Sequence, residues 1–109
     1  MENKFSIMYS AEARNDLKRI KSYITSVLLS PQAASIQTKR IRESVRRLEL
    51  MPERYVAVDW EPWHSLGVRK VPVDNYVIFY YVDKLMKEVN ILRIFYGGRN
   101  VEEIIKNYD

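Results

Sequence analysis

The chain of 109 residues contains no cysteine, one histidine and three glycines. Without cysteine it forms no disulfide, no thiolate metal site and no cysteine nucleophile. A metal site that includes His64 would need several carboxylates close together, and no such group is visible along the sequence. We therefore expect neither a metal ion nor any other cofactor.

Long apolar stretches are also missing. No run approaches the ~20 residues that a membrane-spanning helix needs. The first ten residues, MENKFSIMYS, lack the apolar centre and the small-residue cleavage site of a signal peptide. We therefore expect a cytoplasmic protein without a membrane partner. The length and a content of 47% hydrophobic and 29% charged residues are typical of one folded domain, residues 1–109.

The net charge of +4 is distributed unevenly. Residues 11–50 hold nine Lys and Arg against four Asp and Glu, whereas residues 51–109 hold eight against nine. A basic segment of this kind is typical of a protein that binds a polyanion or an acidic partner, but it also suits a solvated helix surface. Charge alone does not distinguish these interpretations.

Capping residues and hydrophobic periodicity predict a strand followed by two helices. The strand covers residues 4–10, Ser10 caps the first helix, and Ser30 with Pro31 begins the second. Apolar residues recur every three or four positions on each helix, namely Ala13, Leu17, Ile20, Ile24 and Val27, and then Ala34, Thr38, Ile41, Val45 and Leu48. The short link makes the two helices antiparallel neighbours.

A structured loop over residues 53–67 precedes three predicted strands, 68–73, 75–82 and 87–96. Short links make these strands antiparallel, and Pro72 places the first of them at a sheet edge. Asn100 caps a final helix that extends to residue 108. The fold class is α+β: an N-terminal strand and a helical hairpin packed on one face of a small, mostly antiparallel four-stranded sheet, with a short C-terminal helix. The other face of the sheet stays at least partly open.

The stretch RIFYGGRN, residues 93–100, places a cation inside an apolar strand. Side chains alternate along a strand, so Arg93 shares a face with Val89, Ile91 and Phe95. Burial of an unpaired guanidinium is too unfavourable to persist there. Either Asp74 or Asp83 pairs with Arg93, or Arg93 points from the open face.

The glycine pair in the same stretch predicts a turn with positive φ at the point where the chain leaves the sheet. Exposed N–H groups beside the cation of Arg99, at the start of a helix, suit a phosphate. A plain turn with a solvated Arg99 accounts for the same residues.

The order of elements, the run RKVPVDNYVIFYYV and the strand end RIFYGGR together resemble the RelE/ParE superfamily of toxins from bacterial type II toxin–antitoxin modules. The resemblance extends over nearly the whole chain. It implies a cognate antitoxin, acidic and partly disordered, that lies across the helical hairpin and the sheet. Members differ in activity: some cut mRNA in the ribosomal A site, and others bind and poison DNA gyrase.

For the ribonuclease branch the resemblance implies metal-independent attack of a ribose 2′-OH on the adjacent phosphate, assisted by a base, an acid and cations. It assigns catalytic roles to Lys70, Arg93, Tyr96 and Arg99, and RNA binding to Arg69 and His64.

Three positions depart from the pattern of the ribonucleases. Val77 stands where RNA-cutting members often carry an arginine, Gly98 stands where many relatives have the first of two arginines, and Tyr108 falls about one turn beyond the expected catalytic tyrosine. We favour a ribosome-dependent mRNA endoribonuclease that inhibits translation, with the ribosome and mRNA as partners. The alternatives are a non-enzymatic inhibitor of DNA gyrase and a non-catalytic nucleic-acid-binding domain that uses the arginines of residues 40–47.

Overall fold

The computed structural model describes residues 4–107 and confirms the α+β class. The elements are β1 (Ser6–Tyr9), α1 (Ala11–Ser26), α2 (Pro31–Arg46), η1 (Arg47–Glu49), η2 (Pro52–Arg54), β2 (Arg69–Val73), β3 (Tyr76–Asp83), β4 (Glu88–Tyr96) and α3 (Val101–Lys106), where η1 and η2 are 3₁₀ turns. Tyr108, at the predicted end of the last helix, lies outside the described residues.

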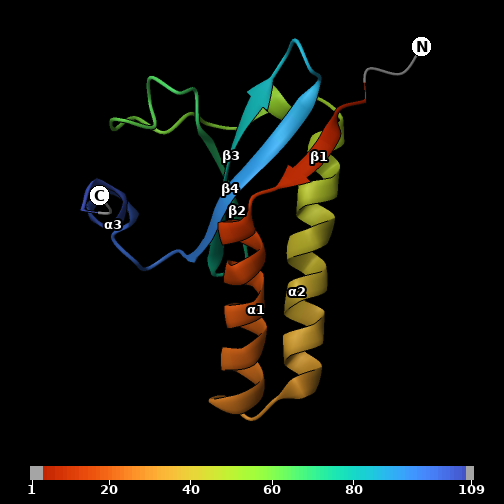
Figure 1. Ribbon diagram of the computed structural model, residues 1–109. Coiled ribbons are helices and arrows are strands. Elements are labelled where there is room, and N and C mark those ends of the chain that lie inside the picture. Colours follow the sequence, from red (N-terminus) through yellow and green to blue (C-terminus); the bar gives the residue numbers. More distant parts are fainter. Residues whose placement is uncertain (1–3, 108–109) are drawn as a thin grey trace.

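The four strands form one sheet in the order β1-β4-β3-β2. β1 runs parallel to β4, and the other neighbouring strands are antiparallel. β2, which contains Pro72, is therefore an edge strand, as predicted. The α1–α2 hairpin and α3 lie on different sides of the sheet (Figure 1).

Serine caps begin both long helices, as predicted. The Ser10 hydroxyl oxygen accepts a hydrogen bond from the Ala13 N–H at 2.9 Å, and that of Ser30 accepts one from the Ala33 N–H at 3.3 Å. Pro31 follows at the first helical position, where an N–H would have no partner within the helix. Within residues 4–107 none of the helices is both long and apolar enough to cross a membrane.

One core lies between the helical hairpin and the sheet. It contains the apolar stripes predicted on the two helices, except for Val27, which is 59% exposed because α1 ends one residue earlier. Leu48 is buried in this core although it follows the end of α2. Tyr80 of β3 is fully buried here, and its hydroxyl donates to the Pro52 carbonyl at 2.6 Å. This hydrogen bond attaches η2 to the sheet.

A β-bulge interrupts β4. Phe79 of β3 is paired with Arg93, but the next residue of β3 is paired with Ile91, so Leu92 is the extra residue. The bulge changes which side chains share a face, and Ile91 and Ile94 both belong to the core under the hairpin. The predicted row that joined Ile91 to Arg93 is therefore wrong.

A second core covers much of the opposite face of the sheet. Its buried members come from the loop before β2, from the two central strands and from α3, and they are Val58, Trp63, Val68, Phe79, Phe95 and Val101. The ring of Trp63 lies 5.0 Å from that of Phe79 and 5.0 Å from that of Trp60, measured between centroids. This face is thus less open than predicted, because the loop and α3 supply apolar side chains that cover it.

Candidate functional site

Lys70 and Arg93, two of the cations with predicted catalytic roles, lie on different strands of the sheet. Lys70 on β2 is paired with Phe79 on β3, which is paired with Arg93 on β4. Neighbouring strands are about 4.8 Å apart, so the backbone positions of Lys70 and Arg93 are separated by roughly 10 Å. Phe79 is buried between them and lies against Trp63. The strand between Lys70 and Arg93 thus contributes a buried aromatic residue at this position.

Arg93 is held by a carboxylate that we did not consider from the sequence. Its Nε and Nη2 donate to the two oxygens of Asp16 on α1 at 2.9 and 3.0 Å. The side chains of Arg93 and Asp16 are only 13% and 3% exposed, so the ion pair is largely buried. The two predicted partners are wrong. Asp74 accepts two hydrogen bonds from Arg40 instead, and the Asp83 carboxylate accepts one from the Met86 N–H.

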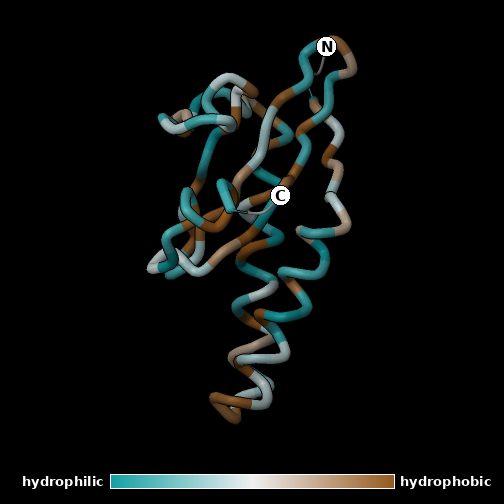
Figure 2. Tube along the Cα trace, turned by 60° about the vertical axis from the view of Figure 1, so that its left-hand side comes forward, coloured by the Kyte–Doolittle hydropathy of each residue, from teal (hydrophilic) through white to brown (hydrophobic). Residues whose placement is uncertain are grey.

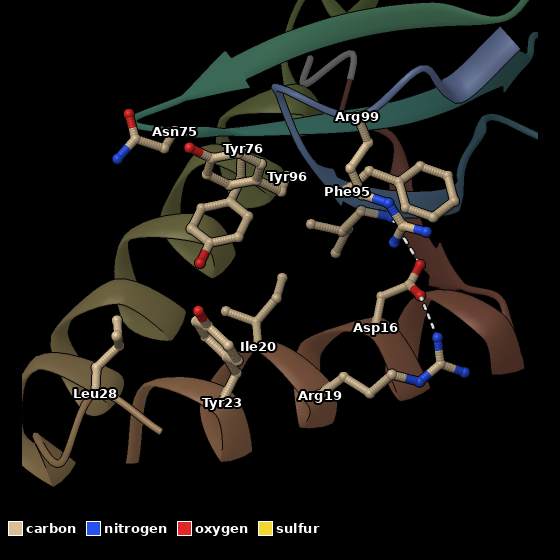
Figure 3. A pocket seen from close by; sticks show the side chains of 11 residues that line it. Asp16, Arg19, Ile20, Tyr23, Leu28, Asn75, Tyr76, Phe95, Tyr96 and Arg99 are labelled. Atoms are coloured by element: carbon tan, nitrogen blue, oxygen red, sulfur yellow. Dashed lines mark hydrogen bonds and ion pairs between the residues drawn. The ribbon is translucent and has the colours of Figure 1, made fainter. Parts of the chain in front are cut away.

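Asp16 also accepts a hydrogen bond from the backbone of β4, at the edge that β1 does not cover. β1 ends opposite Ile91, and beyond this point the Asp16 carboxylate accepts a hydrogen bond from the Ile94 N–H at 2.9 Å (Figure 3). The Ser10 hydroxyl donates to the Leu92 carbonyl at 2.8 Å. A carboxylate inside the apolar stripe of the first helix was the sequence signal that could have identified Asp16.

Arg93 and Arg99 lie against the same aromatic ring, the side chain of Phe95. The distance from the guanidinium carbon to the ring centroid is 4.3 Å for Arg93 and 5.3 Å for Arg99. Tyr96, the last residue of β4, is 53% exposed. The structure thus places three of the four predicted catalytic residues near the end of β4 and leaves Lys70 apart.

The glycine pair does not have the predicted backbone conformation, since neither glycine has a positive φ. Close contacts explain the pair instead. A Cβ atom on Gly97 would lie 3.2 Å from the Asn75 carbonyl oxygen, and one on Gly98 would lie 2.8 Å from a ring carbon of Tyr96. The Gly97 N–H donates to the Asn75 carbonyl at 2.7 Å, which extends the pairing of β3 and β4 by one step.

Several backbone N–H groups near Arg99 already have partners within the protein. The N–H groups of Gly97, Arg99 and Val101 donate to backbone carbonyls, and that of Glu103 donates to the side chain of Asn100. Asn100 is therefore the predicted cap of α3, a helix of six residues. These four N–H groups are not available to a phosphate, and a phosphate-binding role of Arg99 stays a prediction.

The two residues predicted to bind RNA have partners within the protein. Arg69 donates to the Tyr55 carbonyl at 2.7 Å and lies 4.0 Å from the Glu53 carboxylate. His64 lies with its Nδ1 2.9 Å from the Val58 carbonyl oxygen, a contact that stabilises the loop before β2. Within residues 4–107 no three His, Asp or Glu side chains lie close enough to bind one metal ion.

An aromatic groove of about 690 Å³ lies between α1 and the ends of β3 and β4 (Figure 3). Tyr23 from α1 and Tyr76 and Tyr96 from the strands line it, and Tyr23 is 53% exposed. Arg99 lies at one end of the groove. Leu28, from the apolar tip of the helical hairpin that Figure 2 shows, also lines it. Exposed aromatic and aliphatic side chains in a concave surface are typical of a protein-binding site.

One protein family matches nearly the whole chain. The family described as "ParE toxin of type II toxin-antitoxin system, parDE" matches residues 7–101. No curated protein matches the chain.

Solved structures of toxin–antitoxin systems resemble the protein. A chain of the chromosomal ParDE system from P. aeruginosa is 26% identical with a TM-score of 0.70, over 87% of this chain and 98% of that one. Chains of the RelBE2 complex from Mycobacterium tuberculosis and of the archaeal RelE-RelB complex from Pyrococcus horikoshii share the fold, at 18% and 17% identity and TM-scores of 0.58 and 0.60. The former match covers 85% of this chain and 91% of that one, and the latter covers 88% and 98%.

The resemblance to the RelE/ParE superfamily is confirmed by the family match, the fold and these relatives. The chain belongs to the ParE toxin family of type II toxin–antitoxin systems.

Proposed function

We propose that this toxin acts without catalysis, by binding a protein target, and that the target is DNA gyrase. The observation that carries the proposal is the position of Lys70 and Arg93 on strands on either side of β3, opposite the buried residue Phe79. Cleavage of RNA by general acid–base chemistry requires the base, the acid and the cations around one phosphate, with reacting atoms about 3–3.5 Å apart. The separation and the aromatic cover support binding rather than cutting.

The ion pair between Arg93 and Asp16 also supports binding rather than catalysis. Its guanidinium is largely neutralised by the carboxylate of Asp16, and both side chains are nearly buried. Stabilisation of a phosphoryl group in the transition state requires donors that are aimed at the developing charge. An arginine that already binds a buried carboxylate is better suited to holding α1 against β4.

The family match supports the gyrase-binding branch of the superfamily. Val77 stands where RNA-cutting members often carry an arginine, Gly98 stands where many relatives have the first of two arginines, and Val77 is partly buried in the second core. No arginine at either position is therefore available to a phosphate.

We infer that a segment of the antitoxin occupies the aromatic groove. The groove offers exposed apolar area from Tyr23, Leu28 and Tyr96, and Arg19 and Arg99 lie on its rim. An acidic segment with apolar anchors, which folds on contact, matches both features. The relatives from P. aeruginosa, M. tuberculosis and P. horikoshii come from toxin–antitoxin systems or complexes, which supports a partner of this kind.

Two assays with the purified toxin distinguish the activities. We expect the toxin to inhibit DNA supercoiling by gyrase and to leave a translated message intact in primer extension. Lys70→Ala should inhibit gyrase as well as the unchanged protein does, because a toxin that acts by binding alone does not need the predicted catalytic lysine, which is exposed. Addition of the antitoxin should restore supercoiling.

The second candidate is the ribosome-dependent ribonuclease, which is favoured by the closeness of Arg93 and Arg99 to the Phe95 ring. It predicts breaks within codons only when ribosomes are present, and supercoiling that the toxin does not affect. In that case Lys70→Ala should slow cleavage by about 10²- to 10⁴-fold. This combination of results would overturn the proposed gyrase target.

A further inference from the structure

A second groove, with positively charged rims, lies between α1 and α2, which run antiparallel side by side (Figure 1). Its volume is about 440 Å³. Arg14, Lys18 and Lys21 line it from α1, and Arg42 lines it from α2. Arg46, one turn beyond Arg42, is close enough to act electrostatically on Tyr9 in the same groove. We call these five cations and Tyr9 the basic groove.

The five cations of the basic groove make no ion pair within residues 4–107. No acidic side chain lines the groove beside Tyr9, although Arg46 also lines a neighbouring hollow that contains Glu43 and Glu49. Other cations differ in this respect, since Arg19, Arg40 and Arg93 each lie beside a carboxylate. Like charges on two facing helices repel each other, so an anion bound between them gains favourable energy from both.

The hydroxyl of Tyr9 adds a hydrogen-bond donor to the basic groove. Within residues 4–107 this hydroxyl makes no hydrogen bond. Burial raises the pKa of Tyr9 above its ordinary value of 10.0, although Arg42 and Arg46 act in the opposite direction. The hydroxyl therefore keeps its proton at neutral pH and can donate it to an oxygen of a bound anion.

The floor of the groove indicates what kind of anion fits. Leu17 and Thr38, which form part of it, are both buried, whereas the cations on both sides of the groove are exposed. The aromatic groove, in contrast, offers the exposed rings of Tyr23 and Tyr96, which suit an amphipathic peptide. A phosphate backbone has no apolar face and needs only cations and hydroxyl donors.

The spacing of the cations along α1 also suits a nucleic acid. Arg14 and Lys21 are seven residues apart on one helix, a rise of about 10.5 Å. Over this distance one strand of duplex DNA presents about three phosphates, at 3.4 Å of axis per charge. Three cations on α1 and two on α2 match such a segment of backbone.

We propose that the basic groove binds the phosphate backbone of duplex DNA without sequence specificity. In the cell the DNA would be the segment held by gyrase. This identification of the DNA rests on the proposed function, whereas the proposed binding to duplex DNA does not. The binding itself is measured without gyrase, so failure of this proposal and failure of the gyrase target give different results.

The test is fluorescence anisotropy of a short labelled DNA duplex with the purified toxin, between about 50 and about 200 mM salt. The toxin should bind with a steep salt dependence. The groove variant Arg14→Gln/Lys18→Gln/Lys21→Gln should bind at least ~10-fold more weakly at the lower salt concentration and lose about three from the slope of log K against log salt.

The matched control is Arg47→Gln/Arg54→Gln/Lys84→Gln, which removes the same charge from exposed residues that do not line the groove. The control should retain DNA binding and its salt slope. Circular dichroism and thermal melting should show that both triple variants are folded. Equal weakening of both variants, or no binding of the duplex by the unchanged toxin, would overturn the proposal.

Two competitors separate DNA from other polyanions. Single-stranded RNA of the same length and polyglutamate should each displace the labelled duplex less effectively than unlabelled duplex does. If either competitor is more effective than the duplex, the groove is a site for RNA or for an acidic protein segment, and the assignment to duplex DNA is wrong.

Discussion

Asp16 connects three parts of the molecule through one carboxylate. It accepts two hydrogen bonds from Arg93 and one from the Ile94 N–H. Arg19 lies 3.7 Å from the same carboxylate (Figure 3). These contacts fix the start of α1 to β4 at the point where β1 no longer covers the strand edge. A buried acid in an apolar stripe is tolerated because every one of these partners is a donor.

We expect Arg93→Ala to lower the free energy of unfolding by about 3–5 kcal/mol, because the buried carboxylate of Asp16 would lose its cation. Urea denaturation of the purified variant measures this change. Arg19→Ala is the matched control, since its side chain is 71% exposed and its loss should have little effect on stability. A folded Arg93→Ala protein of unchanged stability that is not toxic would instead indicate a direct role of Arg93 at a target.

Tyr80 should limit stability in alkaline solution. Burial raises the pKa of its hydroxyl well above the ordinary value of 10.0. A group whose pKa is higher in the folded state contributes stability that is complete below the unfolded pKa and is lost as the pH rises above it. The free energy of unfolding should therefore fall above about pH 10.

The variant Tyr80→Phe tests this prediction. It removes the hydrogen bond to the Pro52 carbonyl and should lower stability at neutral pH by about 1–3 kcal/mol. Urea denaturation at several pH values should then show a smaller further loss above pH ~10 than in the unchanged protein. If both proteins lost the same amount of stability above pH ~10, the loss would be due to groups other than the Tyr80 hydroxyl.

The loop before β2 and α3 act as one cover on the sheet face opposite the helical hairpin. Trp63 is the centre of this cover, because it contacts both Trp60 and Phe79. Val101 joins α3 to the same cluster. The cover stabilises the sheet and fills much of the face that we expected to stay open.

We expect Trp63→Ala to lower the free energy of unfolding by about 3–5 kcal/mol, since it removes a large buried ring and leaves a cavity over Phe79. Urea denaturation measures the change. Leu66→Ala in the same loop is the control, because Leu66 is exposed and should have little effect. A nearly neutral Trp63→Ala would mean that the cover does not pack on the sheet in solution.

The molecule presents two grooves of different chemistry on its helical hairpin. The aromatic groove includes Tyr23, Leu28 and Tyr96, whereas the basic groove contains cations that make no ion pair within residues 4–107. Such a division allows one protein to bind an apolar, acidic segment and a polyanion at separate surfaces. The proposed antitoxin segment would bind the aromatic groove, and the proposed DNA contact would be made by the basic groove.

We expect toxin production alone to arrest growth, and the product of an adjacent small reading frame to restore growth and to co-purify with the toxin. Tyr23→Ala/Leu28→Ala should weaken this complex by roughly 10-fold or more, because exposed aromatic anchors dominate such interfaces. Isothermal titration calorimetry measures the affinity. Leu85→Ala/Met86→Ala, at exposed apolar residues of the β3–β4 turn, is the control and should leave the affinity unchanged.

The local structure of the chain followed directly from its sequence. Ser10, Ser30 and Asn100 cap helices as predicted, and Pro72 lies on an edge strand. The motif around RIFYGGR correctly indicated the toxin superfamily. These features depend on residues that are close together in the chain, so periodicity and capping rules describe them well.

The partners of the functional residues were decided only by the tertiary structure. Arg93 and Asp16 are 77 positions apart, and nothing in the strand pattern indicates which of several carboxylates faces the guanidinium. The bulge at Leu92 changed which side chains of β4 share a face of the sheet. Trp63 covered part of a face that the alternation of side chains along the strands had predicted to be open. Each outcome depends on how α1, the loop and α3 pack on the sheet, because side chains distant in sequence compete there for the same space and the same hydrogen-bond donors.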